Sequence, residues 1–242
     1  LRRRGASPSR RAPLAAAGPK GQTSPMLLTP SWPVNGLLLL VAAPLAACPA
    51  APDDDDDDST DEASSNSAGC GKAPVDLVGA SQIEQDFGPD ADGLRSFHLV
   101  LPQSYDPEQP YPLILGYPGT DWMGWQMRGY LGLEDVAGAD AIFVYPDPLT
   151  RDFDGWGTYG GWLLGPHATP AAGDADLRFT EGILDRIEAD YCVDTDRVFV
   201  TGHSWGGDMA AVVACFLGDR VRAAAPAAAN RPYWFEPADG GA

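Results

Sequence analysis

Short apolar runs recur along the chain from residue 95 onward, with polar or helical segments between them. They lack the alternation of polar and apolar positions that marks a strand with one wet face. Each run is therefore typical of a strand that is buried on both faces of a sheet. The clear runs are Arg95–Leu101, Tyr111–Tyr117, Ala141–Tyr145 and Arg197–Thr201, and a weaker fifth is Val221–Ala225.

Two segments between these runs have helical periodicity. Asp174–Tyr191 repeats apolar residues at helical spacing, and Asp174 could cap its first turn. Asp208–Leu217 predicts a second, more apolar helix. Strands that alternate with helices predict an α/β fold with a doubly wound, mostly parallel sheet. The first two strands are separated by a short segment that contains DPEQP and could instead pair antiparallel.

The charge of the chain is unevenly distributed. The formal net charge is −18, from 16 Lys and Arg against 34 Asp and Glu. Six of the basic residues lie within residues 1–25, so the chain from residue 49 onward has 10 basic and 34 acidic residues, a balance of −24. A region with this much negative charge repels phosphate backbones, which excludes nucleic acid as a partner. The length of 242 residues suits one domain with extensions.

The amino-terminal region is typical of a targeting segment. A basic leader (1–25) precedes a signal segment (26–48) that contains the apolar run Gly36–Ala47. This run is too short to span a bilayer and has the length of a signal-peptide core. It ends in LAAC, which resembles the lipobox of bacterial lipoproteins, in which the cysteine is lipidated. We therefore expect export and a membrane anchor through lipid on Cys48; a plain cleaved signal is the alternative.

Residues 49–68 form an acidic linker with six consecutive aspartates, followed by Ser, Thr, Asn and Ala. Such a segment cannot bury apolar surface, and its like charges extend it. A calcium site there is disfavoured because ligands in such a run have no fixed geometry. The linker therefore predicts a disordered tether, and the domain itself spans residues 69–242. The Cys and His spacings match no zinc pattern, so no metal site is predicted.

The motif that carries chemistry is Gly202-His203-Ser204-Trp205-Gly206. A buried strand runs into this G-x-S-x-G pattern and a helix follows, which is the context of a nucleophile elbow. Ser204 is the predicted nucleophile. The start of the following helix presents backbone N–H groups and the positive end of its dipole. The N–H of Trp205 is therefore the first predicted donor to a developing oxyanion.

A second oxyanion donor is expected from the loop that follows the strand Tyr111–Tyr117. Pro118 has no N–H, so the donor is Gly119 or, preferably, Thr120. His203 is adjacent to the nucleophile, but successive side chains of a strand point to opposite faces. We therefore expect His203 to be a packing residue and not the catalytic base.

These segments together resemble the polyhydroxybutyrate depolymerase and feruloyl esterase group of secreted α/β-hydrolases, and the feruloyl esterase branch is the closer match. The resembling stretches are Ser67–Lys72, Arg95–Gly116, Gly155–Gly161, Glu188–Gly207 and Ala214-Cys215. The resemblance implies an extracellular carboxylic-ester hydrolase with a Ser-His-Asp triad, an acyl-enzyme intermediate and no cofactor. The family usually has a histidine at the position of Pro118, and Trp162–Gly173 looks like an insertion.

In this family the triad acid and histidine lie well downstream of the serine. Here 38 residues follow Ser204 and none of them is histidine. His98 belongs to an early strand, and His167 lies in the apparent insertion. We therefore expect that the chain is incomplete, that the triad partners and last strands lie beyond residue 242, and that the chain alone lacks turnover.

Three other functions are compatible with the same sequence features. A polyhydroxyalkanoate depolymerase shares the chemistry, and a serine peptidase shares the triad but usually has extra domains. A non-catalytic binding protein on a hydrolase scaffold is the alternative if residue 242 is the true end. The sequence leaves the oligomeric state open.

Aromatic residues gather in the loops that we expect to border the site, where they could stack on an aromatic acyl group such as ferulate. They are Trp122, Trp125, Trp156 and Tyr159. Disulfides are expected in an oxidising compartment. Cys70 and Cys192 lie in two of the family-like segments, and we expect them to pair.

Overall fold

The computed structural model describes residues 65–138, 140–153, 155, 157–164 and 174–229. The predicted leader, signal segment and most of the acidic linker lie outside these residues. So do three individual residues that the sequence analysis singled out, Cys48, Trp156 and His167.

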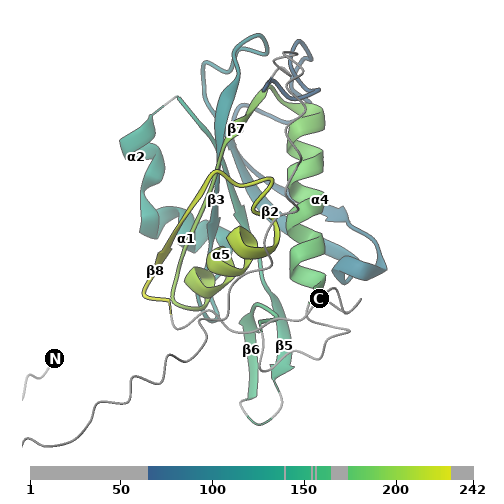
Figure 1. Cartoon of the computed structure of the whole chain (residues 1–242), viewed down its shortest axis with the longest axis vertical. Coiled ribbons are helices and arrows are strands. Elements are labelled where there is room, and N and C mark those ends of the chain that lie inside the picture. The colour runs from purple at the N-terminus through teal and green to yellow at the C-terminus, as the bar shows by residue number, and fades with distance from the viewer. Residues whose placement is uncertain (1–64, 139, 154, 156, 165–173, 230–242) are drawn as a thin grey trace, which may run out of the picture. The chain divides into compact units, whose positions relative to one another are not determined.

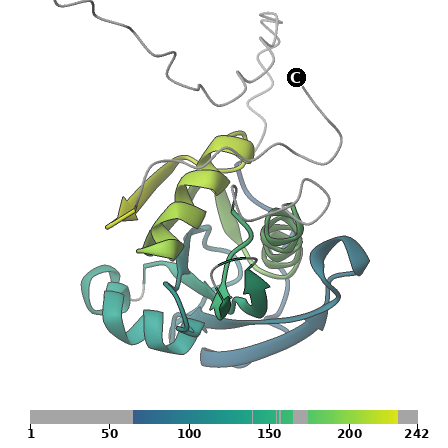
Figure 2. The same ribbon diagram turned by 90° about the horizontal axis from the view of Figure 1, so that it is seen from below.

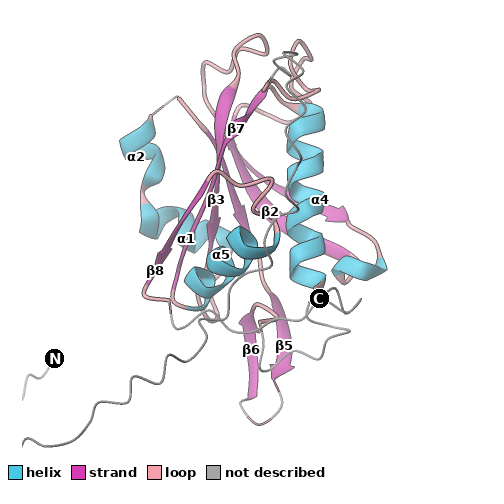
Figure 3. Ribbon diagram, viewed as in Figure 1, coloured by secondary structure: helices cyan, strands magenta, loops and turns pink. Residues whose placement is uncertain are grey.

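Within the described residues, one sheet of six strands organises the domain (Figures 1 and 3). Strands β4, β3, β7 and β8 are mutually parallel, and β2 and β1 continue the sheet antiparallel from β4. In spatial order the strands are β1 (Gly79–Asp86), β2 (Leu94–Leu101), β4 (Ile142–Pro146), β3 (Tyr111–Tyr117), β7 (Val193–His203) and β8 (Ala223–Ala227). The predicted α/β class with a mostly parallel sheet is confirmed.

The five predicted strands are present as β2, β3, β4, β7 and β8, but the suggested pairing of the first two is wrong. β2 pairs antiparallel with β4, and β4 separates it from β3. The chain leaves β3 through helices that cross over the sheet, which returns the next strand parallel to β3. β4 thereby occupies the position beside β3 that a simple hairpin would have given to β2.

Helices cover both faces of the sheet (Figure 2). α1 (Gly124–Leu131) and α2 (Leu133–Ala137) lie on one face, and α4 (Ala175–Asp190) and α5 (Trp205–Phe216) lie on the other. The larger apolar core lies on the α4 and α5 side, and a smaller core packs under α1. None of the described helices is both long and apolar enough to cross a bilayer.

Both predicted helices form, with shifted starts. α5 begins at Trp205, three residues before the predicted Asp208. Asp174 does not cap α4 with its side chain. Its carboxylate instead accepts a hydrogen bond from Arg178 Nε at 3.1 Å. Asp174 has helical backbone angles (φ −95°, ψ −2°) and not the extended ones typical of a capping residue, which accounts for the missing cap.

A small antiparallel hairpin that the sequence did not predict lies beyond the carboxyl end of β4. It consists of β5 (Leu149–Phe153) and β6 (Gly157–Gly161), seen at the lower end of Figure 1. Trp162, which follows β6, is fully buried. Trp162 and the two residues after it, at the start of the segment interpreted as an insertion, belong to the core.

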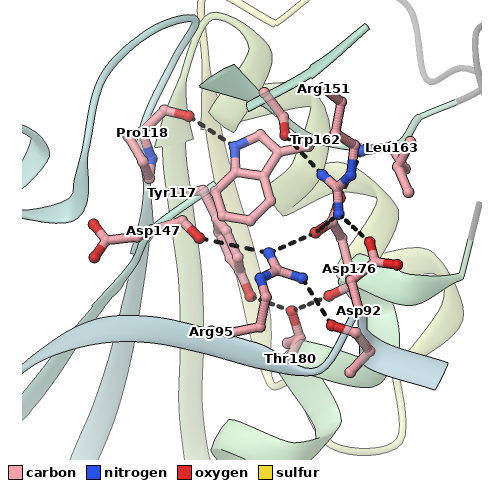
Figure 4. Close-up of polar contacts among 12 residues, drawn as sticks. Asp92, Arg95, Tyr117, Pro118, Asp147, Arg151, Trp162, Leu163, Asp176 and Thr180 are labelled. Carbon is pink, nitrogen blue, oxygen red and sulfur yellow. Dashed lines mark hydrogen bonds and ion pairs between the residues drawn. The ribbon is translucent and has the colours of Figure 1, made fainter. Parts of the chain in front are cut away.

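A buried carboxylate joins this hairpin to the rest of the domain (Figure 4). Asp176, in the first turn of α4, has no exposed surface. It accepts hydrogen bonds from Arg95 Nη2 of β2 at 2.7 Å, from Arg151 Nη1 of β5 at 3.2 Å and from the Leu163 N–H at 2.6 Å. One carboxylate thus links the sheet, the hairpin and α4.

The start of the domain is fastened to the amino end of β7. The structure contains a disulfide between Cys70 and Cys192, the pair that the sequence analysis proposed. Beside it, Ser67 Oγ donates to the Tyr191 carbonyl at 2.7 Å and accepts from the Val193 N–H at 2.9 Å. The segment that follows the acidic linker is therefore attached at the end of β7 opposite Ser204.

We predict that Asp176→Asn lowers the free energy of unfolding by about 3–5 kcal/mol, because it leaves the buried Arg95 guanidinium without its counter-charge. Urea denaturation measures the change. Glu181→Gln is the matched control, since it breaks an exposed ion pair with Arg178 on the same helix and should cost about 1 kcal/mol or less. Equal losses in the two variants would contradict this role for Asp176.

Candidate active site

Ser204 lies on a strained turn between β7 and α5. Its φ of 56° and ψ of −125° are outside the regions that a residue with a side chain normally adopts. The turn is tied to the neighbouring strand, because the Ser204 N–H donates to the Ala227 carbonyl of β8 at 2.9 Å. Backbone strain of this kind is held by surrounding structure and is concentrated at functional sites. The predicted elbow is therefore present as a defined local geometry.

The two glycines of the motif permit this geometry. A Cβ on Gly202 would collide with the Gly206 carbonyl, so the strand and the helix approach each other too closely for a side chain. A Cβ on Gly206 would likewise collide with the carbonyl oxygens of Tyr117 and Pro118, at the end of β3. The start of α5 therefore lies directly against the loop that follows β3.

This loop also contacts the nucleophile. A Cβ built on Gly119 would lie 3.3 Å from Ser204 Cβ and 3.0 Å from the His203 carbonyl oxygen. The N–H groups of Thr120 and Trp205 form no hydrogen bond within the described part of the chain. The structure therefore brings the predicted residues together: Ser204, the loop residues Gly119 and Thr120, and the first residue of α5, Trp205.

The aromatic residues around the site come from two directions. Trp122 packs edge-on against Tyr130, with ring centroids 5.4 Å apart. The ring of Tyr130 packs on His203 at 5.1 Å, so His203 has an aromatic neighbour on α1. Trp125, also on α1, is 61% exposed. Sequence reasoning missed Tyr130 because α1 itself has a weak apolar pattern and was not predicted.

The hairpin forms the other aromatic border. Trp205 packs on Phe153 of β5, with centroids 4.6 Å apart. A Cβ on Gly161 of β6 would lie 2.9 Å from the Trp205 ring. Tyr159, on the same strand, is about one-third exposed at 36%. The hairpin therefore packs against the indole of Trp205, the residue whose N–H is the first predicted oxyanion donor.

Asp147 follows β4 at the same edge of the sheet. It accepts hydrogen bonds from Ser96 Oγ and from the Gly124 N–H, both at 2.6 Å, and His98 Nε2 lies 3.5 Å away. Burial raises the pKa of Asp147, but the hydrogen bonds from Ser96 and Gly124 and the nearby His98 ring act in the opposite direction and hold it below its usual range. Asp147 therefore stays ionised at neutral pH and anchors the start of α1.

Neither described histidine forms a hydrogen bond with Ser204 Oγ, and the ring of His203 packs on Tyr130 instead. His98 is on β2, and β4 and β3 lie between it and β7. Three strand spacings amount to about 14 Å, so the ring cannot reach Ser204. No described side chain forms a hydrogen bond with Ser204 Oγ, and no metal-binding group of three or more His, Cys, Asp or Glu exists among the described residues.

A strained Ser204 at the junction of a strand and a helix, on a mostly parallel sheet with helices on both faces, is the arrangement of the α/β-hydrolase fold. The fold class expected from the resemblance is therefore confirmed.

Comparison of the sequence with known proteins narrows this fold class to a group of similar enzymes. No protein-family model matches the chain. Feruloyl esterase C of Emericella nidulans is 33% identical over 168 residues, which cover 66% of this chain and 52% of that protein. Feruloyl esterase D of Neurospora crassa is 31% identical over 175 residues, 67% of this chain and 53% of that protein. The resemblance to the feruloyl esterase branch is therefore confirmed, and the chain spans about half the length of these curated relatives.

Solved structures with a similar arrangement include a ferulic acid esterase, at 21% identity and a TM-score of 0.48, which covers 63% of this chain and 60% of that one. An acetyl xylan esterase from Aspergillus awamori is also 21% identical, with a TM-score of 0.45 and coverage of 60% of this chain and 50% of that one.

We predict that Gly206→Ala destabilises the protein by about 1–3 kcal/mol or more, because its Cβ would overlap the carbonyl oxygens that end β3. Gly129→Ala is the matched control on α1. Nothing lies within 4 Å of its added Cβ, so better helix propensity should stabilise the protein by up to about 1 kcal/mol. Thermal unfolding of both variants measures the difference. Equal tolerance of the two alanines would show that the elbow is not so tightly packed.

Proposed function

We propose that this protein is a serine carboxylic-ester hydrolase that forms an acyl-enzyme on Ser204. The observation that carries the proposal is the strained turn of Ser204 beside two backbone N–H groups, those of Thr120 and Trp205, that have no described partner. Such donors stabilise the oxyanion of an acyl-transfer reaction. The sequence similarity to feruloyl esterases supports the same chemistry.

The reaction proceeds in two steps. Ser204 Oγ attacks the ester carbonyl as a base removes its proton, and the two N–H groups hold the negative oxygen of the tetrahedral intermediate. The alkoxy group leaves with the proton from the base. Water then attacks the acyl-enzyme with the help of the same base and releases the acid and the serine. Because neither His98 nor His203 forms a hydrogen bond with Ser204 Oγ in the structure, we propose that the base is a histidine outside the described residues.

The proposed substrate is an ester of an aromatic acid, such as a ferulate ester carried on a plant polymer. Trp122, Tyr130 and Tyr159 supply aromatic surface on two sides of the elbow, and rings of this kind stack on an aromatic acyl group. We further propose an extracellular location with a lipid anchor on Cys48, as the sequence pattern indicates. A polyhydroxyalkanoate depolymerase would use the same nucleophile with an aliphatic acyl group, so the substrate comparison below distinguishes the two.

The test compares methyl ferulate, a hydroxybutyrate oligomer and p-nitrophenyl acetate as substrates of the full-length natural protein. We predict that Ser204→Ala lowers turnover by about a million-fold, the typical cost of removing the nucleophile of a triad. Ser104→Ala, at an exposed serine remote from the elbow, should leave turnover unchanged.

Trp122→Ala should raise KM for methyl ferulate much more than KM for p-nitrophenyl acetate, since acetate has no ring to stack. Preferential hydrolysis of the hydroxybutyrate oligomer would replace the proposed substrate with an aliphatic polyester. Turnover that survives Ser204→Ala would overturn the proposed mechanism. The absence of any hydrolysis would favour a non-catalytic binding protein.

A further inference from the structure

Asp121 fastens the loop after β3 to strand β6 of the hairpin. Its N–H donates to the Gly160 carbonyl at 2.8 Å, and its Oδ1 accepts from the Gly160 N–H, also at 2.8 Å. Asp121 has a φ of 58°, in the left-handed region that residues with side chains seldom occupy. This conformation directs both its backbone N–H and its carboxylate toward one residue, 39 positions away in the sequence.

The strand that receives Asp121 is itself held in place. Arg151 Nη1 donates to the Gly161 carbonyl at 3.1 Å, and the buried Asp176 accepts from the Leu163 N–H (Figure 4). Trp162 lies between Gly161 and Leu163 in the sequence, and its Nε1 donates a hydrogen bond to the Pro118 carbonyl at 2.8 Å (Figure 4). Residues 160–163 are therefore a fixed support, which we call the brace.

The brace contacts both ends of residues 118–121 after β3, the segment that contains the proposed donor Thr120 and that we call the oxyanion loop. Pro118 accepts from Trp162, and Asp121 exchanges two hydrogen bonds with Gly160. Gly119 and Thr120 lie between these two attachments, with Gly119 against Ser204 Cβ. If either attachment were released, the Thr120 N–H would lose its fixed direction, and an oxyanion donor is effective only when it is held in place before the reaction.

We propose that Asp121 is a positioning residue for the oxyanion hole, and that it acts through the acceptor capacity of Oδ1 and not through its negative charge. This inference rests on the proposed esterase function. The carboxylate forms no ion pair with a described residue, and its described hydrogen bond is the one that Oδ1 accepts from the Gly160 N–H. A neutral side chain with the same acceptor oxygen should therefore replace it.

Two substitutions separate the possible roles. Asp121→Asn keeps the Oδ1 acceptor, removes the charge and tolerates the left-handed conformation. Asp121→Gly also tolerates that conformation but removes the acceptor. We predict that Asp121→Gly lowers kcat for p-nitrophenyl acetate by about 10-fold to 100-fold with little change in KM, approaching the loss of one oxyanion donor. Asp121→Asn should stay within about threefold of the wild type.

A readout that needs no turnover accompanies the kinetics. In the 242-residue chain, deuterium uptake in the peptides that span residues 118–124 and 157–163 should rise in Asp121→Gly and remain at the wild-type level in Asp121→Asn. Unchanged uptake in Asp121→Gly would overturn the inference whether or not the protein is an esterase. So would an equal kinetic loss in both variants, which would assign the role to the charge.

The kinetic measurement includes Ser204→Ala in parallel, so that the two proposals fail separately. If turnover persists in Ser204→Ala, the proposed function is wrong. If turnover requires Ser204 and Asp121→Gly retains the wild-type kcat, the proposed function stands and the positioning role of Asp121 is wrong.

Discussion

The tight contact between three backbone segments at the elbow is the constraint on which the site depends. The end of β7, the start of α5 and the loop after β3 meet where Gly202 and Gly206 leave no room for a Cβ. This contact holds Ser204 at a positive φ and presents its side chain beside the oxyanion loop. A strained backbone conformation persists only where surrounding contacts hold it in place. At Ser204 these contacts are the backbone segments on two sides and the hydrogen bond to β8.

A second set of hydrogen bonds connects the elbow region to the rest of the domain. The oxyanion loop is attached to the brace, and the brace is attached through Asp176 to β2, β5 and α4. A buried ion pair contributes little net stability when compared with well-packed apolar residues, but its directional hydrogen bonds specify one arrangement. The two arginines on Asp176 therefore link the hairpin to β2 and α4 in one defined arrangement. The hairpin therefore contacts the site residues directly, as the sheet does.

The parts of the molecule that sequence could predict are those encoded locally. The elbow follows from glycine spacing between a buried strand and a helix, and the central strands follow from apolar runs such as Tyr111–Tyr117, whose bounds agree with β3. β1 escaped prediction because Ile83 is its only buried residue. The hairpin and the brace escaped because they are defined by long-range contacts, such as Trp162 with Pro118, that leave no local periodicity. The pairing of β2 was wrong for the same reason, since strand order is decided by the crossover between β3 and β4.

The most direct test of the account is the location of the covalent intermediate. Exposure of the full-length natural protein to a fluorophosphonate, followed by peptide mass spectrometry, identifies the residue whose oxygen is activated for attack. The account predicts one phosphonylated peptide, with the adduct on Ser204, and slower formation of that adduct when the oxyanion loop is released from the brace. An adduct on another residue, in a protein that still hydrolyses esters, would contradict the assignment of the elbow as the catalytic centre.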